Sequence, residues 1–525
     1  MEKPTVCRTQ LWFVVFTSFP LFVVLFYALD FSTLNGQTHG VSLVLGSFAS
    51  ALNVHKPVYN GTTGISEVAR NVSGFLDTTV PKSPDGLNPN HIDDPCTGRY
   101  VYVHDLPSRF NRDILSDCKS LVEWYDMCPY VKNMGLGPQV KNHGKVLMGK
   151  SWFSTNQFLL EVIFHNRMKS YECLTEDSSM ASAIFVPVYA GLDIGRYLWN
   201  YSTSVRDSLA LDLVEWLREK PEWKRVWGRD HFFVAGRISW DFHRLSNKEF
   251  DWGSKLMTLP ESMNLTMLSI EATSWSNEFA IPYPAYFHPS TEAQVLQWQK
   301  RMRRRKRRYL FSFAGAPRPN MGKSSVRAEI IRQCLASGSH CKLLDCNSSE
   351  RKCENPEEVI KVFQDSIFCL QPPGDSYTRR STFDSILAGC IPVFFHPASA
   401  YAQYTWYFPK NYTAYSVFMT EKSIKQGNLS ISRTLQHRVS KREVSAMREE
   451  IISLIPKLLY ANPKSKLDNL EDAFDIAVNG VLKRVEEVRR VIKEGRDPSV
   501  GFAEENSWKL KLSGIGSEQE WDQFF

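Results

Sequence analysis

Residues 366–395 constrain the fold of this chain more than any other segment, because they read as strand, loop, helix and strand in succession. The apolar run Ile367–Leu370 is typical of a strand that is buried on both faces. Two prolines and a glycine at 372–374 end that strand. Residues Thr378–Leu387 then fit a short helix, which Gly389 closes as the residue after its C-cap. With a second strand at Ile391–Phe395, the segment predicts a parallel β-α-β unit.

The first turn of the predicted helix has the chemistry of a phosphate site. In a parallel unit this turn lies at the carboxyl end of the preceding strand, where α/β sheets bind ligands. Free backbone N–H groups and the guanidinium groups of Arg379 and Arg380 favour an anion there. Asp384, one turn further along, could accept hydrogen bonds from ribose hydroxyls. The alternatives are an ion pair between Asp384 and Arg380 and, for each arginine alone, a surface salt bridge.

A second strand–loop–helix unit repeats this chemistry upstream. The strand Tyr309–Phe313 leads into a loop that carries Gly315 and Arg318, and the next helix carries Arg327. The glycine would let the backbone approach a ligand, and both arginines could reach a phosphate. Further alternation of strands and helices upstream predicts an α/β fold with largely parallel sheets. The strands are expected at Tyr100–His104, Ala183–Val188 and His231–Ala235, and the helices at Gln157–Met168 and Ser208–Leu217.

The segment 366–395 resembles the nucleotide-sugar-binding half of exostosin-type glycosyltransferases, glycosyltransferase family 47. Trp152–Asp193, Asp230–Asp241 and Ile281–Pro289 match in the same order, so the resemblance covers roughly residues 95–440. The plant members that add galactose to xyloglucan look most similar. The resemblance implies a GT-B-like fold, in which two Rossmann-type domains face a cleft. It also implies inverting transfer of galactose from UDP-galactose to xylose side chains of xyloglucan. The donor-binding residues would be Gly315, Arg318, Arg327, Gly374, Asp375, Ser376, Thr378, Arg379, Arg380 and Asp384.

The catalytic base is expected from the first domain, within hydrogen-bond reach of the acceptor oxygen. Asp193 is the first choice, because it follows a predicted strand and the expected turn Ala190-Gly191. Asp241, His165 and Glu161 are the competitors. Tyr189, Trp240, Tyr283 and Tyr286 could stack on sugars, although aromatic side chains pack more often in a core.

No metal or other cofactor is expected, because the sequence contains no Asp-x-Asp pair to hold one. Stabilisation of the diphosphate leaving group would then come from helix dipoles and cations.

The N-terminal region predicts a membrane anchor. Residues 11–29 carry no charge, and nineteen residues at about 1.5 Å each cross a bilayer. Lys3 and Arg8 precede the segment, which favours a cytosolic tail at 1–10 and a luminal stem at 30–92. A cleaved signal peptide is the alternative. We therefore expect a single-pass type II protein of the Golgi membrane.

Glycosylation and cysteine usage agree with a luminal chain. Asn-x-Ser/Thr sequons begin at Asn60, Asn71, Asn200, Asn264, Asn347, Asn411 and Asn428. Ten of the eleven cysteines follow the predicted anchor, and an oxidising lumen favours disulfides among them. Cys369 and Cys390 are interpreted instead as buried thiols, because their surroundings are apolar and strand-like.

A chain of 525 residues is too long for one core, so two luminal domains are expected. The predicted limits are 93–290 for an acceptor-side domain, 291–440 for a donor domain, 441–495 for helices that pack back, and 496–525 for a polar tail. The basic run Lys300–Arg308 is typical of a solvated face, with an acidic polysaccharide or a diphosphate as the alternative partner. No nucleic acid is expected as a partner, whereas complexes with other glycosyltransferases are compatible with the sequence.

Two other functions remain open at this level. The same fold could use another UDP-sugar, galacturonate or a pentose, on a wall polysaccharide. A non-catalytic Golgi scaffold is the alternative from a different class, although a scaffold would not need to keep a diphosphate site.

Overall fold

The computed structural model describes residues 94–142, 144–273, 275–317, 325–347 and 352–498. The predicted anchor, the stem and the sequons at Asn60 and Asn71 lie outside these residues. Among the described helices, none is both long enough and apolar enough to cross a bilayer.

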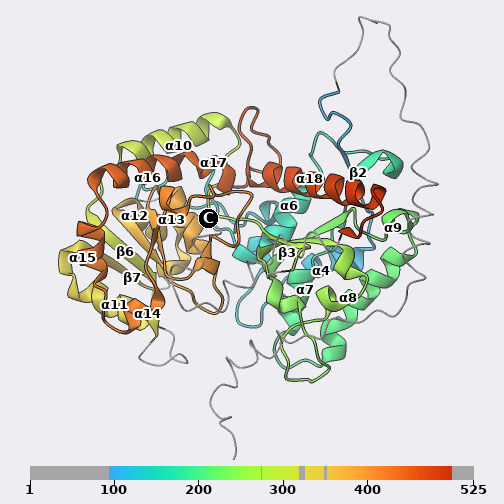
Figure 1. Cartoon of the computed structure of the whole chain (residues 1–525), viewed down its shortest axis with the longest axis horizontal. Helices are drawn as coiled ribbons and strands as arrows, with labels where there is room; N and C mark the ends of the chain where they lie inside the picture. The colour runs from blue at the N-terminus through green and yellow to red at the C-terminus, as the bar shows by residue number, and fades with distance from the viewer. Residues whose placement is uncertain (1–93, 143, 274, 318–324, 348–351, 499–525) are drawn as a thin grey trace, which may run out of the picture. The chain divides into compact units, whose positions relative to one another are not determined.

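Two parallel five-stranded sheets organise the described chain (Figure 1). The first sheet has the order β1-β2-β3-β4-β5, and every neighbouring pair is parallel. Its strands are β1 Tyr100–Val103, β2 Ala181–Phe185, β3 His231–Ile238, β4 Thr266–Glu271 and β5 Glu278–Ala280. The second sheet has the order β10-β9-β8-β6-β7, again parallel throughout. Its strands are β6 Tyr309–Gly315, β7 Cys341–Asp345, β8 Ser366–Gln371, β9 Ile391–Phe394 and β10 Val417–Phe418. The prediction of an α/β fold with parallel sheets is confirmed.

Helices connect the strands, as parallel pairing requires. Those before and between the strands of the first sheet are α4 Arg112–Ser116, α5 Cys128–Val131, α6 Leu160–Met168, α7 Ala190–Tyr197, α8 Thr203–Arg218 and α9 Pro221–Val226. Helix α10 Glu292–Arg304 leads into the second sheet. Around that sheet lie α11 Val326–Ala336, α12 Pro356–Gln364, α13 Arg380–Leu387, α14 Glu421–Lys425 and α15 Ile431–His437. The chain continues as α16 Lys441–Ser453, α17 Ile455–Leu458 and α18 Ala473–Lys493.

Helix α18 packs against the first sheet, although it follows the second in sequence (Figure 1). Asp472 starts the helix, because its side chain accepts hydrogen bonds from the N–H groups of Phe474 and Asp475. An apolar stripe at Phe474, Val478, Val481, Val485 and Val488 is buried. Near the other end of the helix, the Arg489 guanidinium contacts the Asp230 carboxylate at 3.1 Å, just before β3.

The β-α-β unit predicted at 366–395 is present. Helix α13 begins at Arg380, two residues later than expected, and Gly389 follows it with a φ of +64°. The cysteines of this unit are not free thiols, and that interpretation is wrong. Cys369 lies in β8 and Cys390 precedes the neighbouring strand β9, so their Cα atoms come within 5.8 Å and the side chains form a disulfide. The other pairs are Cys96–Cys173, Cys118–Cys128, Cys334–Cys341 and Cys346–Cys353.

The basic run 300–308 is in part a structural element, and a solvated face is the wrong interpretation for Arg307. Its NH1 donates to the carbonyl oxygens of Gln364 at 2.7 Å and Ala388 at 2.9 Å, at the ends of α12 and α13. The cation thereby satisfies carbonyl groups that a helix end leaves unpaired. Burial lowers the pKa of Arg307 to about 9.

Candidate functional site

The second sheet contains a point where the strand order reverses. Chain order runs from β6 outward to β7 in one direction and through β8, β9 and β10 in the other. At such a reversal the loops after the two central strands, here β6 and β8, diverge and leave a crevice for ligands at their carboxyl ends. Consecutive order in the first sheet gives no reversal there. The second sheet therefore supplies the expected ligand site.

Two of the predicted donor residues frame this point. Gly315 is the last residue of β6, and Gly374 lies in the loop after β8. Arg327 of α11 connects the two loops, since its Nε donates to Pro373 O at 2.9 Å and its NH1 to Ala316 O at 3.3 Å. Arg327 thus holds the two loops together. Arg318 lies outside the described residues.

The loop that precedes α13 brings a cation onto the backbone. A methyl group added to Gly374 would overlap the Arg379 guanidinium, so that side chain lies directly across the glycine. Asp375 is exposed and Ser376 half-buried in the same loop. Arg379 is the N-cap residue of α13, and no side chain caps this helix end through a hydrogen bond from its N-cap position. Positive charge from Arg379 and from the first turn of α13 therefore gathers at one place.

A carboxylate from the first sheet reaches this helix end. Oε2 of Glu271, the last residue of β4, accepts hydrogen bonds from the Thr378 N–H at 2.7 Å and from Thr378 Oγ1 at 2.6 Å. The Tyr283 hydroxyl contacts the same Oγ1 at 3.0 Å. Thr378 is buried, whereas Glu271 is half-buried. This contact joins the candidate donor loop to the carboxyl edge of the first sheet.

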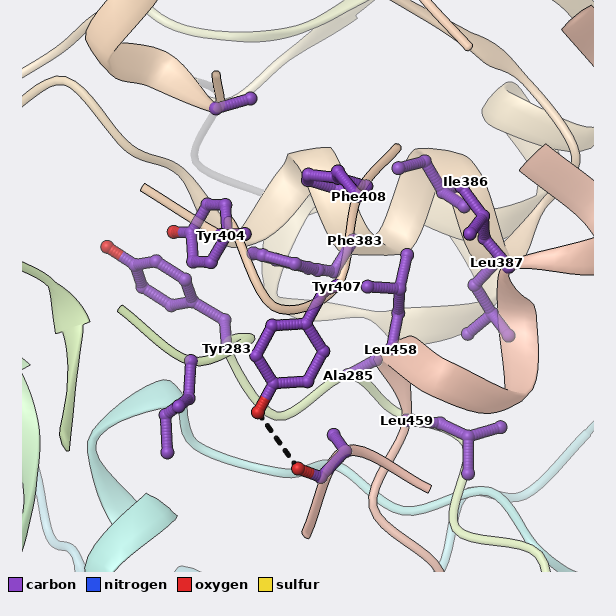
Figure 2. Packing of buried hydrophobic residues seen from close by; sticks show 14 of the residues in the cluster. Tyr283, Ala285, Phe383, Ile386, Leu387, Tyr404, Tyr407, Phe408, Leu458 and Leu459 are labelled. Carbon is purple, nitrogen blue, oxygen red and sulfur yellow. Dashed lines mark hydrogen bonds between the residues drawn. The ribbon is translucent and has the colours of Figure 1, made fainter. Parts of the chain in front are cut away.

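The residues on either side of Glu271 strengthen that junction. The Tyr404 hydroxyl donates to Ile270 O at 2.8 Å, and Ala272 exchanges two hydrogen bonds with the Gln403 side chain. Figure 2 shows Tyr404 beside Phe383 of α13, at 4.9 Å between ring centroids. Three consecutive residues at the end of β4 therefore contact the second half of the chain.

Arg380 and Asp384 form a buried pair on α13. The Arg380 guanidinium lies over the Tyr286 ring, 3.6 Å from its centroid, and donates to the carbonyl oxygen of Thr155. Its Nε is 3.4 Å from an Asp384 oxygen, and the side chains are only 13% and 3% exposed. Burial raises the pKa of Asp384 to about 6, against the opposing effect of Arg380. The geometry favours a bridging role for Arg380, and the ribose role of Asp384 stays a prediction.

Asp193 and Glu161 both serve helix α7. Residues 190–191 are the first turn of that helix and not a separate turn, so Asp193 lies within a helix and pairs with Arg196. Burial raises the pKa of Asp193. The Glu161 carboxylate accepts hydrogen bonds from the N–H groups of Gly191 and Leu192 and so caps the helix. Burial raises the pKa of Glu161 to about 8.

His165 and Asp241 are also engaged by neighbours. The His165 Nδ1 is 2.8 Å from the Tyr189 hydroxyl, and burial lowers the pKa of this histidine to about 3. The two Asp241 oxygens accept from Arg237 Nε at 2.6 Å and from Trp252 Nε1 at 2.7 Å. Among the hydrogen bonds and ion pairs of the described residues, none joins Asp193, Asp241 or His165 to residues 374–380, whereas Glu271 makes two.

Sequence reasoning missed Glu271 and singled out four aromatic residues of which only one is exposed. Tyr189, Tyr283 and Tyr286 are buried, and Trp240 is 45% exposed. A local signal for Glu271 existed, since it is the carboxylate that ends the apolar strand β4. Within the described residues, no group of three or more His, Cys, Asp or Glu side chains is arranged to hold a metal ion.

Comparison with known proteins identifies the class to which this site belongs. The model of the Exostosin GT47 domain matches residues 95–435. The chain therefore belongs to the exostosin GT47 family, and it is a glycosyltransferase.

Curated relatives align over most of its length. The probable xyloglucan galactosyltransferase GT12 of Arabidopsis thaliana is 49% identical over 95% of this chain and 96% of its own. The xyloglucan galactosyltransferase MUR3 of the same plant is 54% identical over 82% of this chain and 70% of its own. The xyloglucan-specific galacturonosyltransferase 1, also from Arabidopsis thaliana, is 42% identical over 74% of this chain and 58% of its own. A solved pneumococcal O-GlcNAc transferase, GtfA, with UDP and GlcNAc bound, aligns with a TM-score of 0.26 at 11% identity over 55% of this chain and 60% of its own, too weakly to support an argument.

Proposed function

We propose that this chain transfers galactose from UDP-galactose to xylose side chains of xyloglucan, with inversion and with UDP as the product. The observation that carries the proposal is the 49% identity over 95% of the chain to a protein named as a xyloglucan galactosyltransferase. The site geometry is compatible with a nucleotide diphosphate donor, since cationic and backbone N–H groups gather where the strand order reverses. The finer fold description, two Rossmann-type domains of GT-B type that face a cleft, belongs to this proposal.

The donor diphosphate would bind at the N-terminus of α13. Arg379, Ser376 and the backbone around Gly374 would contact its oxygens, and Arg327 would keep the loop in place. Arg318 and Gly315 would complete this side of the site. The positive charge would stabilise the leaving UDP as the bond from the sugar to the phosphate oxygen breaks. No divalent metal takes part in this proposal, because helix dipole and guanidinium charge supply that stabilisation.

Glu271 is our proposed catalytic base. An acceptor hydroxyl oxygen attacks the anomeric carbon of galactose from the face opposite UDP, a new carbon–oxygen bond forms, and the hydroxyl proton passes to a base. Glu271 supports this role because it lies at a strand end of the first sheet and contacts the donor loop directly. Negative charge on the bound diphosphate would raise the proton affinity of Glu271, which suits a base.

The setting of the enzyme is part of the same proposal. A type II anchor at 11–29 would hold it in the Golgi membrane with the sheets in the lumen. The described sequons support this topology to the extent that Asn200, Asn347, Asn411 and Asn428 are exposed, while Asn264 is half-buried. The domain limits 93–290, 291–440 and 441–495 stay proposals.

The test is a transfer assay with the full-length chain. Degalactosylated xyloglucan oligosaccharides are incubated with UDP-galactose, UDP-galacturonate or a UDP-pentose, and the products are separated and weighed. We expect a galactose adduct from UDP-galactose only. An adduct from UDP-galacturonate would favour the second candidate, which the 42% identity to a galacturonosyltransferase supports. Absence of transfer from every donor by folded protein would contradict the enzymatic proposal in favour of a scaffold.

A further inference from the structure

Exposed aromatic side chains gather beyond the carboxyl ends of β2 and β3. Trp199 and Tyr201 follow helix α7 and are each 50% exposed, while Trp240 follows β3 and is 45% exposed. Trp252, in the loop after β3, is half-buried. We call these four residues the aromatic strip. Tryptophan rarely lies so open without a role, because exposing an indole forfeits more apolar burial than exposing most other side chains.

The strip is continuous with the candidate site. The Trp199 and Trp252 rings meet edge to face at 4.7 Å, and Trp252 Nε1 donates to Asp241, the neighbour of Trp240 in sequence. In the pairing of β3 with β4, Ile238 lies opposite Glu271. Trp240 therefore follows by two residues the position that faces our proposed base. An acceptor chain that reaches Glu271 would pass over this strip.

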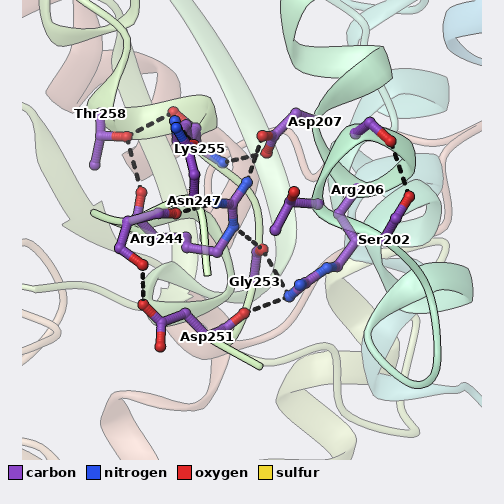
Figure 3. A network of polar contacts seen from close by, with 12 residues as sticks. Ser202, Arg206, Asp207, Arg244, Asn247, Asp251, Gly253, Lys255 and Thr258 are labelled. Carbon is purple, nitrogen blue, oxygen red and sulfur yellow. Dashed lines mark hydrogen bonds and ion pairs between the residues drawn. The ribbon is translucent and has the colours of Figure 1, made fainter. Parts of the chain in front are cut away.

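The loop that carries Trp252 is held rigidly. Figure 3 shows Arg206 and Arg244, both buried, directed at the backbone on either side of Trp252. Arg206 donates to the carbonyl oxygens of Asp251 and Gly253, and Arg244 Nε donates to Gly253 O at 3.0 Å. Charged donors satisfy these carbonyl groups, so the loop keeps its conformation without a ligand. A surface ordered in advance loses less conformational entropy on binding.

We propose that the aromatic strip binds the polysaccharide acceptor along its length, outside the reacting centre. A neutral sugar ring presents a flat C–H face to an indole and hydroxyl groups to polar neighbours, and the strip offers both kinds of surface. Tryptophan and tyrosine supply flat apolar area with a polar tip. Asp241 and Arg237 lie beside Trp252 and Trp240, whereas a greasy protein-docking patch would be aliphatic at its centre. This inference rests on the proposed function.

The protein's own glycan is the competing occupant. Asn200 stands in a sequon between Trp199 and Tyr201, so an attached N-glycan could cover the same rings. The two occupants make different predictions. Loss of acceptor affinity with unchanged stability supports the acceptor, whereas loss of stability on removal of the glycan supports the glycan.

The test compares single variants of the full-length chain. Trp199→Ala and Trp240→Ala should each raise KM for degalactosylated xyloglucan by roughly threefold to tenfold, the size of one aromatic stacking contact. KM for UDP-galactose should not change. Trp199→Tyr should restore most of the affinity and Trp199→Leu little, because only tyrosine keeps a flat aromatic face. Leu335→Ala on α11, a side chain 67% exposed and remote from the strip, is the matched control.

Direct binding separates this inference from the proposed function. Retardation of the chain in a gel that contains degalactosylated xyloglucan reports binding without transfer. If the wild type is retarded and the two tryptophan variants are not, the strip binds the polysaccharide even if no galactose is transferred. Equal retardation and equal KM in wild type and both variants would overturn the inference. So would a Tm loss in Asn200→Gln with no acceptor effect of Trp199→Ala, or a wild type that neither binds nor modifies the polysaccharide.

Discussion

Replacement of Glu271 by glutamine separates its two possible roles. The carboxylate joins the halves of the chain through Thr378, and we propose that it also takes the acceptor proton. A glutamine side-chain oxygen can still accept both hydrogen bonds from Thr378, but the amide cannot take up a proton at neutral pH. Glu271→Gln therefore keeps the junction and removes the base, whereas Glu271→Ala removes both.

The magnitudes of the two effects differ enough to decide between them. Hydrogen bonds to a charged group contribute about 1.5–3 kcal/mol each and neutral ones about half as much. Because Glu271 is half-buried, solvent weakens these bonds, and we expect Glu271→Gln to cost about 1–2 kcal/mol of unfolding free energy. A general base contributes roughly 10²–10⁴ in rate, or about 3–5 kcal/mol of barrier. The fall in kcat should thus far exceed the fall in stability.

The assay measures kcat at saturating donor and acceptor, together with Tm. We expect Glu271→Gln to lose roughly two to four decades in kcat. KM for UDP-galactose should be unchanged or lower, because one negative charge near the diphosphate is gone. Glu172→Gln, which alters an exposed ion pair with Lys466, is the control for a change of charge alone. A Glu271→Gln enzyme with kcat within about threefold of the wild type would refute the base assignment.

Four further predictions follow from the structure. Arg380→Ala should lower unfolding free energy by about 3–5 kcal/mol, because it strands the buried Asp384 carboxylate, whereas Arg379→Ala should mainly raise KM for UDP-galactose; Tm and KM measured together distinguish them. The unfolded state protonates His165 below about pH 6.5 and the folded state only near 3, so stability should fall as pH drops from 6.5, by up to about 1.4 kcal/mol per pH unit, and His165→Gln should flatten the Tm profile. Transfer should persist in excess chelator, and loss that added metal restores would contradict the charge argument. Protease added to sealed microsomes should spare the chain and glycosidase should lower its mass; digestion of the large fragment would exclude the type II topology.

Local sequence signals predicted the strand–helix–strand unit well. Pro372, Gly374 and Gly389 act through their own backbone conformations, so the ends of β8 and α13 could be placed within about two residues. The same holds for the apolar stripe of α18, whose period is a property of one segment.

Contacts between distant segments could not be predicted in this way. Glu271 and Thr378 are 107 residues apart, and no pattern within either segment shows that they meet. The basic run misled because Arg307 finds its carbonyl partners on two other helices. Apolar surroundings hid the Cys369–Cys390 disulfide, since burial fits a thiol and a disulfide equally well until the strand neighbours are known.

The disulfides reinforce each half of the molecule separately. Cys96–Cys173 and Cys118–Cys128 lie around the first sheet, and the other three lie around the second. Within the described chain no cystine crosses from one sheet to the other, so the halves are tied covalently only by the backbone, between β5 and α10 and again between α17 and α18. Each half can thus turn as a stiff body about two short connections, and hydrogen bonds such as those of Glu271 can break and re-form in every catalytic cycle. An enzyme built in this way can open to exchange a long polymer without loosening either of its cores.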